Sequence, residues 1–312
     1  MMSVNLKGRD FLTLQDFTKE ELLQILDTAD YLKMQSKFNK NEKLLEGRTL
    51  GMIFEKSSTR TRVSFEVGMH ELGGYALFLS PKDIQMGRGE TISDTAKVLS
   101  RYVDAIMIRT FSQNIIEELA REGTVPVING LTDDFHPCQV MADFQTIREK
   151  LGRLEGINFT YIGDASNVAH SLLIGGAIMG MNVKMISPKE FSPKEEVVNL
   201  AKEFAKKTGS KIEVTPDVTD AGKDADVLCT DVWVSMGREE EREKRIEKLK
   251  DYQLNQTILD RANKDAIVLH CLPAHRGEEI TKEVIDGPQS VVFDEAENRL
   301  HVQKAIMALI IE

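Results

Sequence analysis

Cysteine is scarce in this sequence, and the cysteines that are present stand far apart. Cys138, Cys229 and Cys271 form no C-x-x-C pair anywhere in the 312 residues. Small disulfide-bonded domains and zinc knuckles depend on closely spaced cysteines. The sequence therefore predicts neither a disulfide framework nor a structural zinc site.

Long apolar runs are also missing. No stretch approaches the roughly 20 consecutive apolar residues that a membrane helix needs. The first ten residues lack the apolar core of a secretory signal. We therefore predict no membrane association and a cytoplasmic location.

An excess of positive charge is absent as well, since the formal net charge is −10. General nucleic-acid binders gain most of their affinity from phosphate contacts, so we predict no nucleic-acid partner. A local cluster of arginines can still oppose a negative global charge. The charge balance therefore leaves a small anionic substrate possible.

Repeats and low-complexity tracts are absent, and the chain instead alternates strand-like and helix-like segments. This alternation is typical of α/β proteins with parallel sheets. Strands are expected at residues 50–54, 104–109, 125–129, 159–162, 183–187, 226–230 and 266–271. Further helices are expected after residue 62, from about residue 168 and over residues 296–311.

Two helices carry clear boundary signals. Thr18 and Glu21 have the spacing of a capping box, so the first helix is expected to begin there. Pro193 is expected in the first turn of a later helix, and Gly209 is expected to end it.

Two successive strand–helix series predict two α/β domains, each a parallel sheet flanked by helices. A chain of 312 residues is long for one compact core. We place the first domain at residues 1–150 and the second at residues 151–296, with the break near the glycines at 152 and 156. A C-terminal helix at about residues 297–312 is expected to pack back on the first domain. Ligands of such sheets bind at the carboxyl ends of the strands.

The segment Lys56-Ser57-Ser58-Thr59-Arg60-Thr61-Arg62 joins an expected strand to an expected helix. Helix N-termini offer unpaired amides and a partial positive charge to anions. Arginine can in addition bind two phosphate oxygens at once. We interpret this segment as a phosphate-binding loop rather than an ordinary solvated helix start.

The segment Phe135-His136-Pro137-Cys138-Gln139 follows the strand expected at residues 125–129. His136 can donate to a carbonyl oxygen and Gln139 can bind an amide. A lone histidine is more often structural than catalytic, so this segment alone leaves both roles open.

The turn Gly163-Asp164-Ala165-Ser166-Asn167 lacks the full G-x-G-x-x-G fingerprint of dinucleotide-binding loops. NAD binding is therefore not predicted.

Two further polar segments follow expected strands. In the segment 231–237, Asp231 can neutralise an ammonium group and Ser235 can hydrogen-bond to it. The charged run 239–250 behind it is expected to be a solvated helix face. In the segment 270–274, Cys271 beside His270 leaves a thiol nucleophile, a metal ligand and an inert buried thiol as alternatives.

These five segments, in this order and over nearly the whole chain, resemble the aspartate and ornithine carbamoyltransferases. The resemblance implies carbamoyl transfer from carbamoyl phosphate to the δ-amine of L-ornithine, giving L-citrulline and phosphate, with no cofactor and no metal. It also implies a homotrimer in which part of the loop 83–90 reaches a neighbouring site.

The resemblance further implies a role for each matching residue. The carbamoyl-phosphate-binding residues would be Ser58, Thr59, Arg60, Thr61, Gln85, Arg109, His136, Gln139, Cys271, Leu272 and Arg299. The ornithine-binding residues would be Asn167, Asp231, Ser235 and Met236. The catalytic residues would be Arg60, His136, Asp231 and Cys271.

Two alternatives stay open. Ala165 and Ser166 stand where ornithine carbamoyltransferases usually have glycine and asparagine, which leaves another amine, such as putrescine or an acylated ornithine, as the acceptor. A catalytically silent ligand-binding relative is the second alternative.

Overall fold

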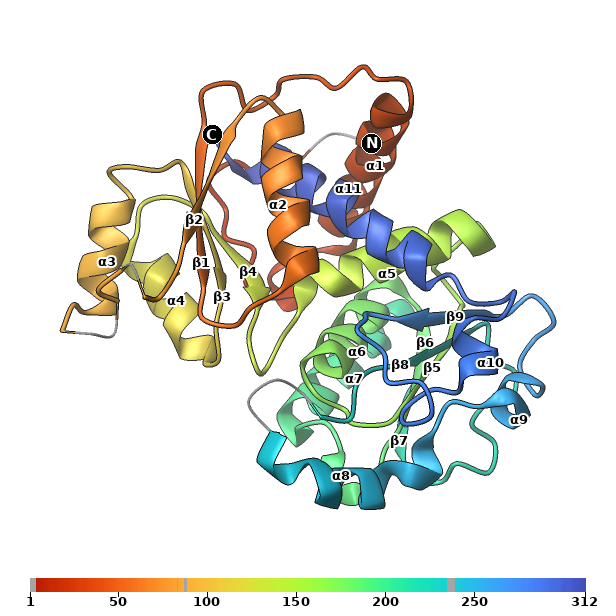
Figure 1. Ribbon diagram of the computed structural model, residues 1–312. Helices are drawn as coiled ribbons and strands as arrows, with labels where there is room; N and C mark the ends of the chain where they lie inside the picture. Colours follow the sequence, from red (N-terminus) through yellow and green to blue (C-terminus); the bar gives the residue numbers. More distant parts are fainter. Residues whose placement is uncertain (1–3, 83, 87–88, 235–238) are drawn as a thin grey trace. The chain divides into compact units, whose positions relative to one another are not determined.

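The structure is a computed structural model that describes residues 4–82, 84–86, 89–234 and 239–312. The chain divides into two compact units. The first runs to Gln145 and includes Glu297–Glu312, and the second is Thr146–Ala296. Each unit contains one parallel sheet with helices packed against it (Figure 1). The predicted α/β fold class is therefore confirmed.

The sheet of the first unit has the strand order β2-β1-β3-β4. Its strands are β1 (Thr49–Phe54), β2 (Tyr75–Leu79), β3 (Ala105–Arg109) and β4 (Val127–Leu131). Phe11 covers the outer edge of β4, because its amide donates to the Val127 carbonyl and its carbonyl accepts from Asn129. β1 and β3 thus lie in the middle, and polar segments follow both.

The helices of the first unit begin with a short 3-10 turn at Leu14–Asp16. They are α1 (Lys19–Lys37), α2 (Thr59–Glu71), α3 (Ile92–Leu99) and α4 (Gln113–Glu122). The predicted capping box is present in α1: the Thr18 side chain accepts from the Glu21 amide, and the Glu21 carboxylate accepts from the Thr18 amide. Two more helices, α5 (Pro137–Leu151) and α11 (Val292–Ile310), each begin in one unit and end in the other.

The last turns of α11 pack on α2 within the first unit. A Cβ atom added at Gly68 of α2 would lie 2.9 Å from the Met307 Cε atom of α11. Glycine at this position therefore lets the two helices approach closely. That approach brings residues of α11 next to the N-terminal turn of α2.

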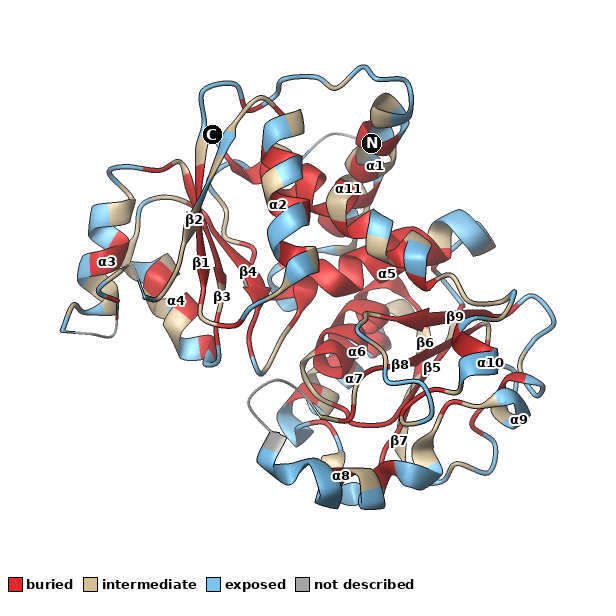
Figure 2. Cartoon of the chain, viewed as in Figure 1, coloured by how far each residue is buried: buried red, intermediate tan, exposed pale blue. Residues whose placement is uncertain are grey.

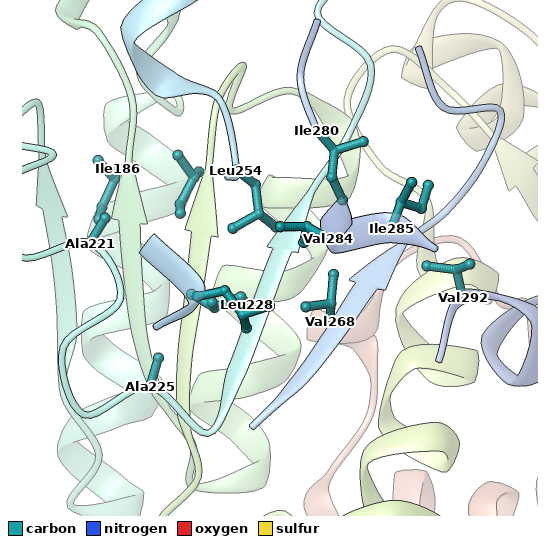
Figure 3. Close-up of a cluster of buried hydrophobic side chains, with 12 residues drawn as sticks. Ile186, Ala221, Ala225, Leu228, Leu254, Val268, Ile280, Val284, Ile285 and Val292 are labelled. Carbon is teal, nitrogen blue, oxygen red and sulfur yellow. The ribbon is translucent and has the colours of Figure 1, made fainter. Parts of the chain in front are cut away.

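The sheet of the second unit has the strand order β7-β6-β5-β8-β9. Its strands are β5 (Asn158–Ile162), β6 (Asn182–Ile186), β7 (Ile212–Thr215), β8 (Val227–Thr230) and β9 (Ile267–His270). One face carries a buried apolar cluster in which Leu228 and Val268 of the strands meet Leu254 and Val284 (Figure 3).

The helices of the second unit are α6 (Asn167–Met179), α7 (Glu195–Thr208), α8 (Arg242–Leu249), α9 (Gln256–Leu259) and α10 (Lys282–Ile285). Short 3-10 turns lie at Lys189–Phe191, Glu239–Glu241 and Lys250–Tyr252. α6 is buried from Val168 to Met179 and packs against α7. Gly209 ends α7 in a left-handed conformation, as predicted.

Some sequence predictions were wrong in detail. β2 and β7 were not predicted, and both are edge strands that are only half-buried (Figure 2). β4 begins two residues later than expected, at Val127. Pro193 lies before α7, whose first residue is Glu195.

Across the part of the chain that the structure describes, no helix has both the length and the apolar character needed to cross a membrane.

Candidate active-site residues in the two units

The predicted phosphate-binding segment lies between β1 and α2. Ser58 is the N-cap of α2, and its side chain accepts from the Thr61 amide at 3.2 Å. Thr59 and Arg60 are therefore the first residues of the helix, where backbone amides and the helix dipole favour an anion. Arg62 has a different role, since it pairs with Glu66 at 3.0 Å on the exposed face.

Arg109 is brought beside this segment by the sheet itself. It is the last residue of β3 and lies opposite Phe54, the last residue of β1. The amide of Glu55 donates to the Arg109 carbonyl at 2.9 Å. The adjacent parallel strands β1 and β3 thus place Arg109 beside the start of the predicted phosphate-binding segment 56–62.

His136 is buried immediately before α5, and Pro137 is the first residue of that helix. Burial, followed by the positive charges of Arg299, Arg109 and Arg60, holds the pKa of His136 well below its usual value. His136 is therefore neutral at pH 7. A neutral imidazole can donate to a carbonyl oxygen, and the arginines near it favour negative charge at the same place.

Arg299 of α11 forms hydrogen bonds with residues of both α2 and α5. Its guanidinium is buried, donating to the Gln139 Oε1 atom at 2.7 Å and to the Thr61 Oγ1 atom at 3.1 Å. The first unit thus gathers these predicted residues in one group: Ser58, Thr59, Arg60, Thr61, Arg109, His136, Gln139 and Arg299.

Gln85 differs from most of this group in its exposure. It lies in the loop between β2 and α3, and its side chain is exposed. Ser235 and Met236, predicted to bind the amino acid, lie outside the described residues.

In the second unit, Asp231 and Cys271 lie side by side at the carboxyl ends of β8 and β9. The register pairs Thr230 with His270, so the next residue of each strand comes together. The Cys271 Sγ atom donates to the Asp231 Oδ1 atom at 2.9 Å. Burial, then the charge and hydrogen bond of Asp231, raise the pKa of Cys271 well above its usual value. The protonated thiol is therefore favoured at neutral pH, which argues against the thiolate-nucleophile alternative.

Leu272 adopts an uncommon backbone conformation beside Cys271, with φ of +56°. Its amide donates to the His270 Nδ1 atom at 2.9 Å, so the ring proton of a neutral His270 must be on Nε2. That nitrogen lies 3.2 Å from the Glu279 Oε1 atom, and both side chains are fully buried. Glu279 and His270 therefore hold the backbone of Leu272 in place, a role that the sequence analysis missed.

Two groups of side chains have the proximity that a metal ion needs. Asp231, His270 and Cys271 each bring one ligand atom within 4.8 Å of the others, as do His275, Glu278 and Glu279. In the first group, His270 uses both ring nitrogens within the protein. In the second, Arg242 binds the Glu278 carboxylate. Neither group therefore offers three uncommitted donors.

The turn before α6 requires glycine at its start. Gly163 has φ of +126°, and a Cβ atom there would lie 3.3 Å from both Thr230 Oγ1 and Trp233 Nε1. Asn167, one of the predicted ornithine-binding residues, is the first residue of α6. Ala165 is buried and lies outside the left-handed region, so its methyl group costs no backbone strain.

The charged run behind Asp231 is not simply a solvated face. Arg245 of α8 is buried, pairs with the Asp164 carboxylate and donates to the Trp233 carbonyl at 2.8 Å. Its guanidinium also lies 4.6 Å from the centre of the Phe191 ring. Arg245 thus connects α8 to the turn before Asn167 and to the segment after Asp231. Ten of the twelve residues in the run 239–250 are charged, so the sequence gave no signal that this arginine differs from its neighbours.

Comparison with known proteins identifies the family of this chain. The carbamoyl-P binding domain model of the aspartate/ornithine carbamoyltransferases matches residues 9–149, and their Asp/Orn binding domain model matches residues 155–310. The ornithine carbamoyltransferase of Oceanobacillus iheyensis is 58% identical over 302 residues, covering 97% of this chain and 94% of that protein. That of Thermococcus kodakarensis is 55% identical over 309 residues, covering 99% and 98%.

A solved structure is similar over the same extent. The ornithine carbamoyltransferase from Pyrococcus furiosus superposes with a TM-score of 0.96 at 53% identity, and the match covers 99% of both chains. Because two family models together span almost all of the sequence and the relatives match it end to end, this chain belongs to the aspartate/ornithine carbamoyltransferase family.

Proposed function

We propose that this protein transfers the carbamoyl group of carbamoyl phosphate to the δ-amine of L-ornithine, giving L-citrulline and phosphate. The observation that carries the proposal is the group of Arg60, Arg109 and Arg299 whose positive charges act on the buried, neutral His136. Such a group suits a ligand that combines a phosphate with a carbonyl. The relatives compared above carry the name ornithine carbamoyltransferase, which supports ornithine as the acceptor.

The chemistry is attack by a neutral amine on the carbamoyl carbon. The new C–N bond forms, the C–O bond to phosphate breaks, and phosphate leaves with the electron pair and takes up the proton that the attacking nitrogen loses. Negative charge grows on the carbonyl oxygen and then on the departing phosphate. Preorganised donors at these positions typically lower the barrier by about 3–4 kcal/mol each.

We assign these donors by their chemistry. Arg60, Thr61 and His136 stabilise the carbonyl oxygen, and His136 does so as a neutral N–H donor. Ser58, Thr59, Arg60 and Arg109 bind the phosphate, together with the first amides of α2. Gln139 and the Leu272 carbonyl accept from the carbamoyl NH2, and Gln85 contributes from its loop.

The second unit binds the amino acid in this proposal. Asp231 neutralises the α-ammonium group and Asn167 binds the carboxylate, while Ser235 and Met236 complete the recognition. The δ-amine, with a pKa of about 10.4 in a lysine-like side chain, must lose a proton before it attacks. Cys271 lies beside this amine in the proposal, and its protonated thiol forms no covalent intermediate.

Citrulline formation by the pure protein tests the proposal directly. Carbamoyl phosphate is supplied with ornithine, putrescine, N-acetylornithine or aspartate in parallel, and the carbamoylated products are measured. We expect turnover with ornithine alone. Preferred use of another amine would support the first alternative, and ligand binding without any product would support the silent relative.

We further propose that the protein assembles as a homotrimer, and its cytoplasmic location stays a prediction from sequence. The first unit exposes apolar side chains on two neighbouring elements, Val63 and Val67 of α2 and Tyr75 and Leu77 of the edge strand β2. Exposed apolar patches on an edge strand commonly mark protein contacts. Light scattering on the purified protein is expected to give three times the mass of one 35.1 kDa chain.

A further inference from the structure

The side-chain amide of Gln139 lies between two charged groups of opposite hydrogen-bonding character. Its Oε1 atom accepts from the Arg299 Nη1 atom at 2.7 Å, and its Nε2 atom donates to the Asp143 Oδ1 atom at 2.9 Å. All three side chains are buried, with exposed fractions of 1% for Gln139, 1% for Asp143 and 2% for Arg299.

This arrangement determines which way the amide faces. A guanidinium can only donate hydrogen bonds, and an ionised carboxylate can only accept them. Turning the amide by half a turn would set its NH2 against the guanidinium and its oxygen against the carboxylate, so that both bonds would be lost. Burial makes that loss costly, because unpaired charges inside a protein are strongly unfavourable.

The spacing along α5 explains how the carboxylate reaches the amide. Gln139 and Asp143 are four residues apart in one helix, so their side chains project from the same face. Gln139 lies in the first turn of α5, three residues after His136. The backbone carbonyl of His136 accepts from the backbone amide of Gln139 at 3.1 Å. The side-chain amide of Gln139 is thus held at the N-terminal end of α5, next to Arg299.

We propose that Asp143 is a positioning residue that makes this protein distinguish carbamoyl phosphate from phosphate. It holds Gln139 with the amide oxygen toward the ligand, where a carbonyl oxygen can accept from the carbamoyl NH2. Phosphate has no such N–H group, so its binding does not use the amide. The inference rests on the proposed function, because it needs carbamoyl phosphate as the ligand.

Two variants and a matched control test this role. Asp143→Ala removes the acceptor, whereas Asp143→Asn keeps one acceptor oxygen in the same place. Asp30→Ala is the control, since Asp30 of α1 accepts at 3.0 Å from the Nε2 atom of Gln145, a glutamine of α5 six residues after Gln139. Calorimetric titration of each full-length variant with carbamoyl phosphate, and separately with inorganic phosphate, gives two dissociation constants.

We expect Asp143→Ala to weaken carbamoyl-phosphate binding about tenfold or more, the usual effect of losing a hydrogen bond to a charged group. Asp143→Asn is expected to recover part of that loss. Phosphate binding should change by less than about twofold in both variants, which also shows that the pocket is folded. Asp30→Ala should bind both ligands like the parent protein.

Other outcomes would overturn the inference. An equal loss for both ligands would mean that Asp143 only supports the pocket, and unchanged binding of both would mean that it does not orient Gln139. A parent protein that binds phosphate but not carbamoyl phosphate would instead contradict the proposed function. The failure of the inference and the failure of the function are therefore separate results.

Discussion

The Cys271 thiol donates a hydrogen bond to the Asp231 carboxylate across a Sγ–Oδ1 distance of 2.9 Å. Both residues stand one position beyond the ends of neighbouring parallel strands, so the pairing follows from the register of β8 and β9. Burial and the neighbouring Asp231 raise the pKa of Cys271, so the thiol keeps its proton. In the proposed reaction, it provides a polar but uncharged sulfur beside the attacking amine.

The reactivity of Cys271 tests this pairing. Its pKa is raised well above the usual value by burial and by Asp231, so little thiolate forms at pH 8. Each unit of pKa lowers the thiolate fraction about tenfold, and we expect iodoacetamide to modify Cys271 at least about tenfold more slowly than a thiol peptide. Asp231→Asn removes the neighbouring charge and should speed the modification.

Peptide mapping by mass spectrometry identifies the modified residue in that experiment. Cys271→Ser is the control, since Cys138 and Cys229 are buried and should stay unmodified. Rapid alkylation of Cys271 in the parent protein, or no acceleration in Asp231→Asn, would contradict the assigned hydrogen bond.

Arg60 is expected to be needed for turnover rather than for folding. It is the second residue of α2, only half-buried, and is one of three arginines that act on His136. Arg60→Gly should lower kcat by at least about a hundredfold, as expected when a donor to the reacting oxygen is lost. The far-ultraviolet circular dichroism spectrum should stay unchanged. Citrulline formation at saturating substrate measures the effect, and near-normal turnover would refute the role.

Much of this site was predictable because its residues stand at helix starts and strand ends, where the sequence pattern itself places them. Ser58 is an N-cap of the kind that starts helices, and the helix it starts follows a buried strand. Arg109 ends the neighbouring strand, so the parallel order alone places it nearby. The same reasoning puts Asp231 and Cys271 together after β8 and β9.

Other parts of the site could not be predicted, because they depend on tertiary contacts between distant segments. Asp143 is an ordinary helix carboxylate in the sequence, and only packing shows that it faces the Gln139 amide. Glu279 gains its role from His270, nine residues earlier. The edge strand β7 was missed for a different reason: its sequence, Ile-Glu-Val-Thr, lacks the continuous apolar run that identifies central strands. The edge strand β2, Tyr-Ala-Leu-Phe-Leu, does carry such a run, and the sequence analysis overlooked it.

Acid should destabilise the protein partly through His301. Its pKa is lowered from 6.5 to about 4, mainly by burial and then by the charge of Lys33. Between these values the unfolded chain binds a proton that the folded protein does not, so the free energy of unfolding falls as the pH drops from 6.5 toward 4. His301→Gln should flatten this fall. Urea unfolding at pH 7 and at pH 5 gives the loss of unfolding free energy for the parent protein and for His301→Gln. An equal loss in both proteins would contradict the lowered pKa of His301.

Arg245 is expected to be the charged residue of α8 on which both stability and ornithine use depend. It is 2% exposed, and its partner Asp164 would be left buried without this cation in Arg245→Met. Removing one partner of a buried ion pair typically costs about 3–5 kcal/mol in the free energy of unfolding. The ornithine KM should also rise, because the Trp233 carbonyl and the turn before Asn167 lose a common anchor.

Arg242→Met is the matched control for that experiment. Arg242 lies three residues earlier in the same helix and pairs with Glu278, but its side chain is 44% exposed. Solvent screens such a pair, so its loss should cost no more than about 1 kcal/mol. Denaturant unfolding and ornithine saturation curves compare the two variants. If Arg242→Met and Arg245→Met behaved alike, burial of the guanidinium would not be what makes Arg245 important. The contacts of Arg245 with Asp164 and with the Trp233 carbonyl would then have no functional consequence.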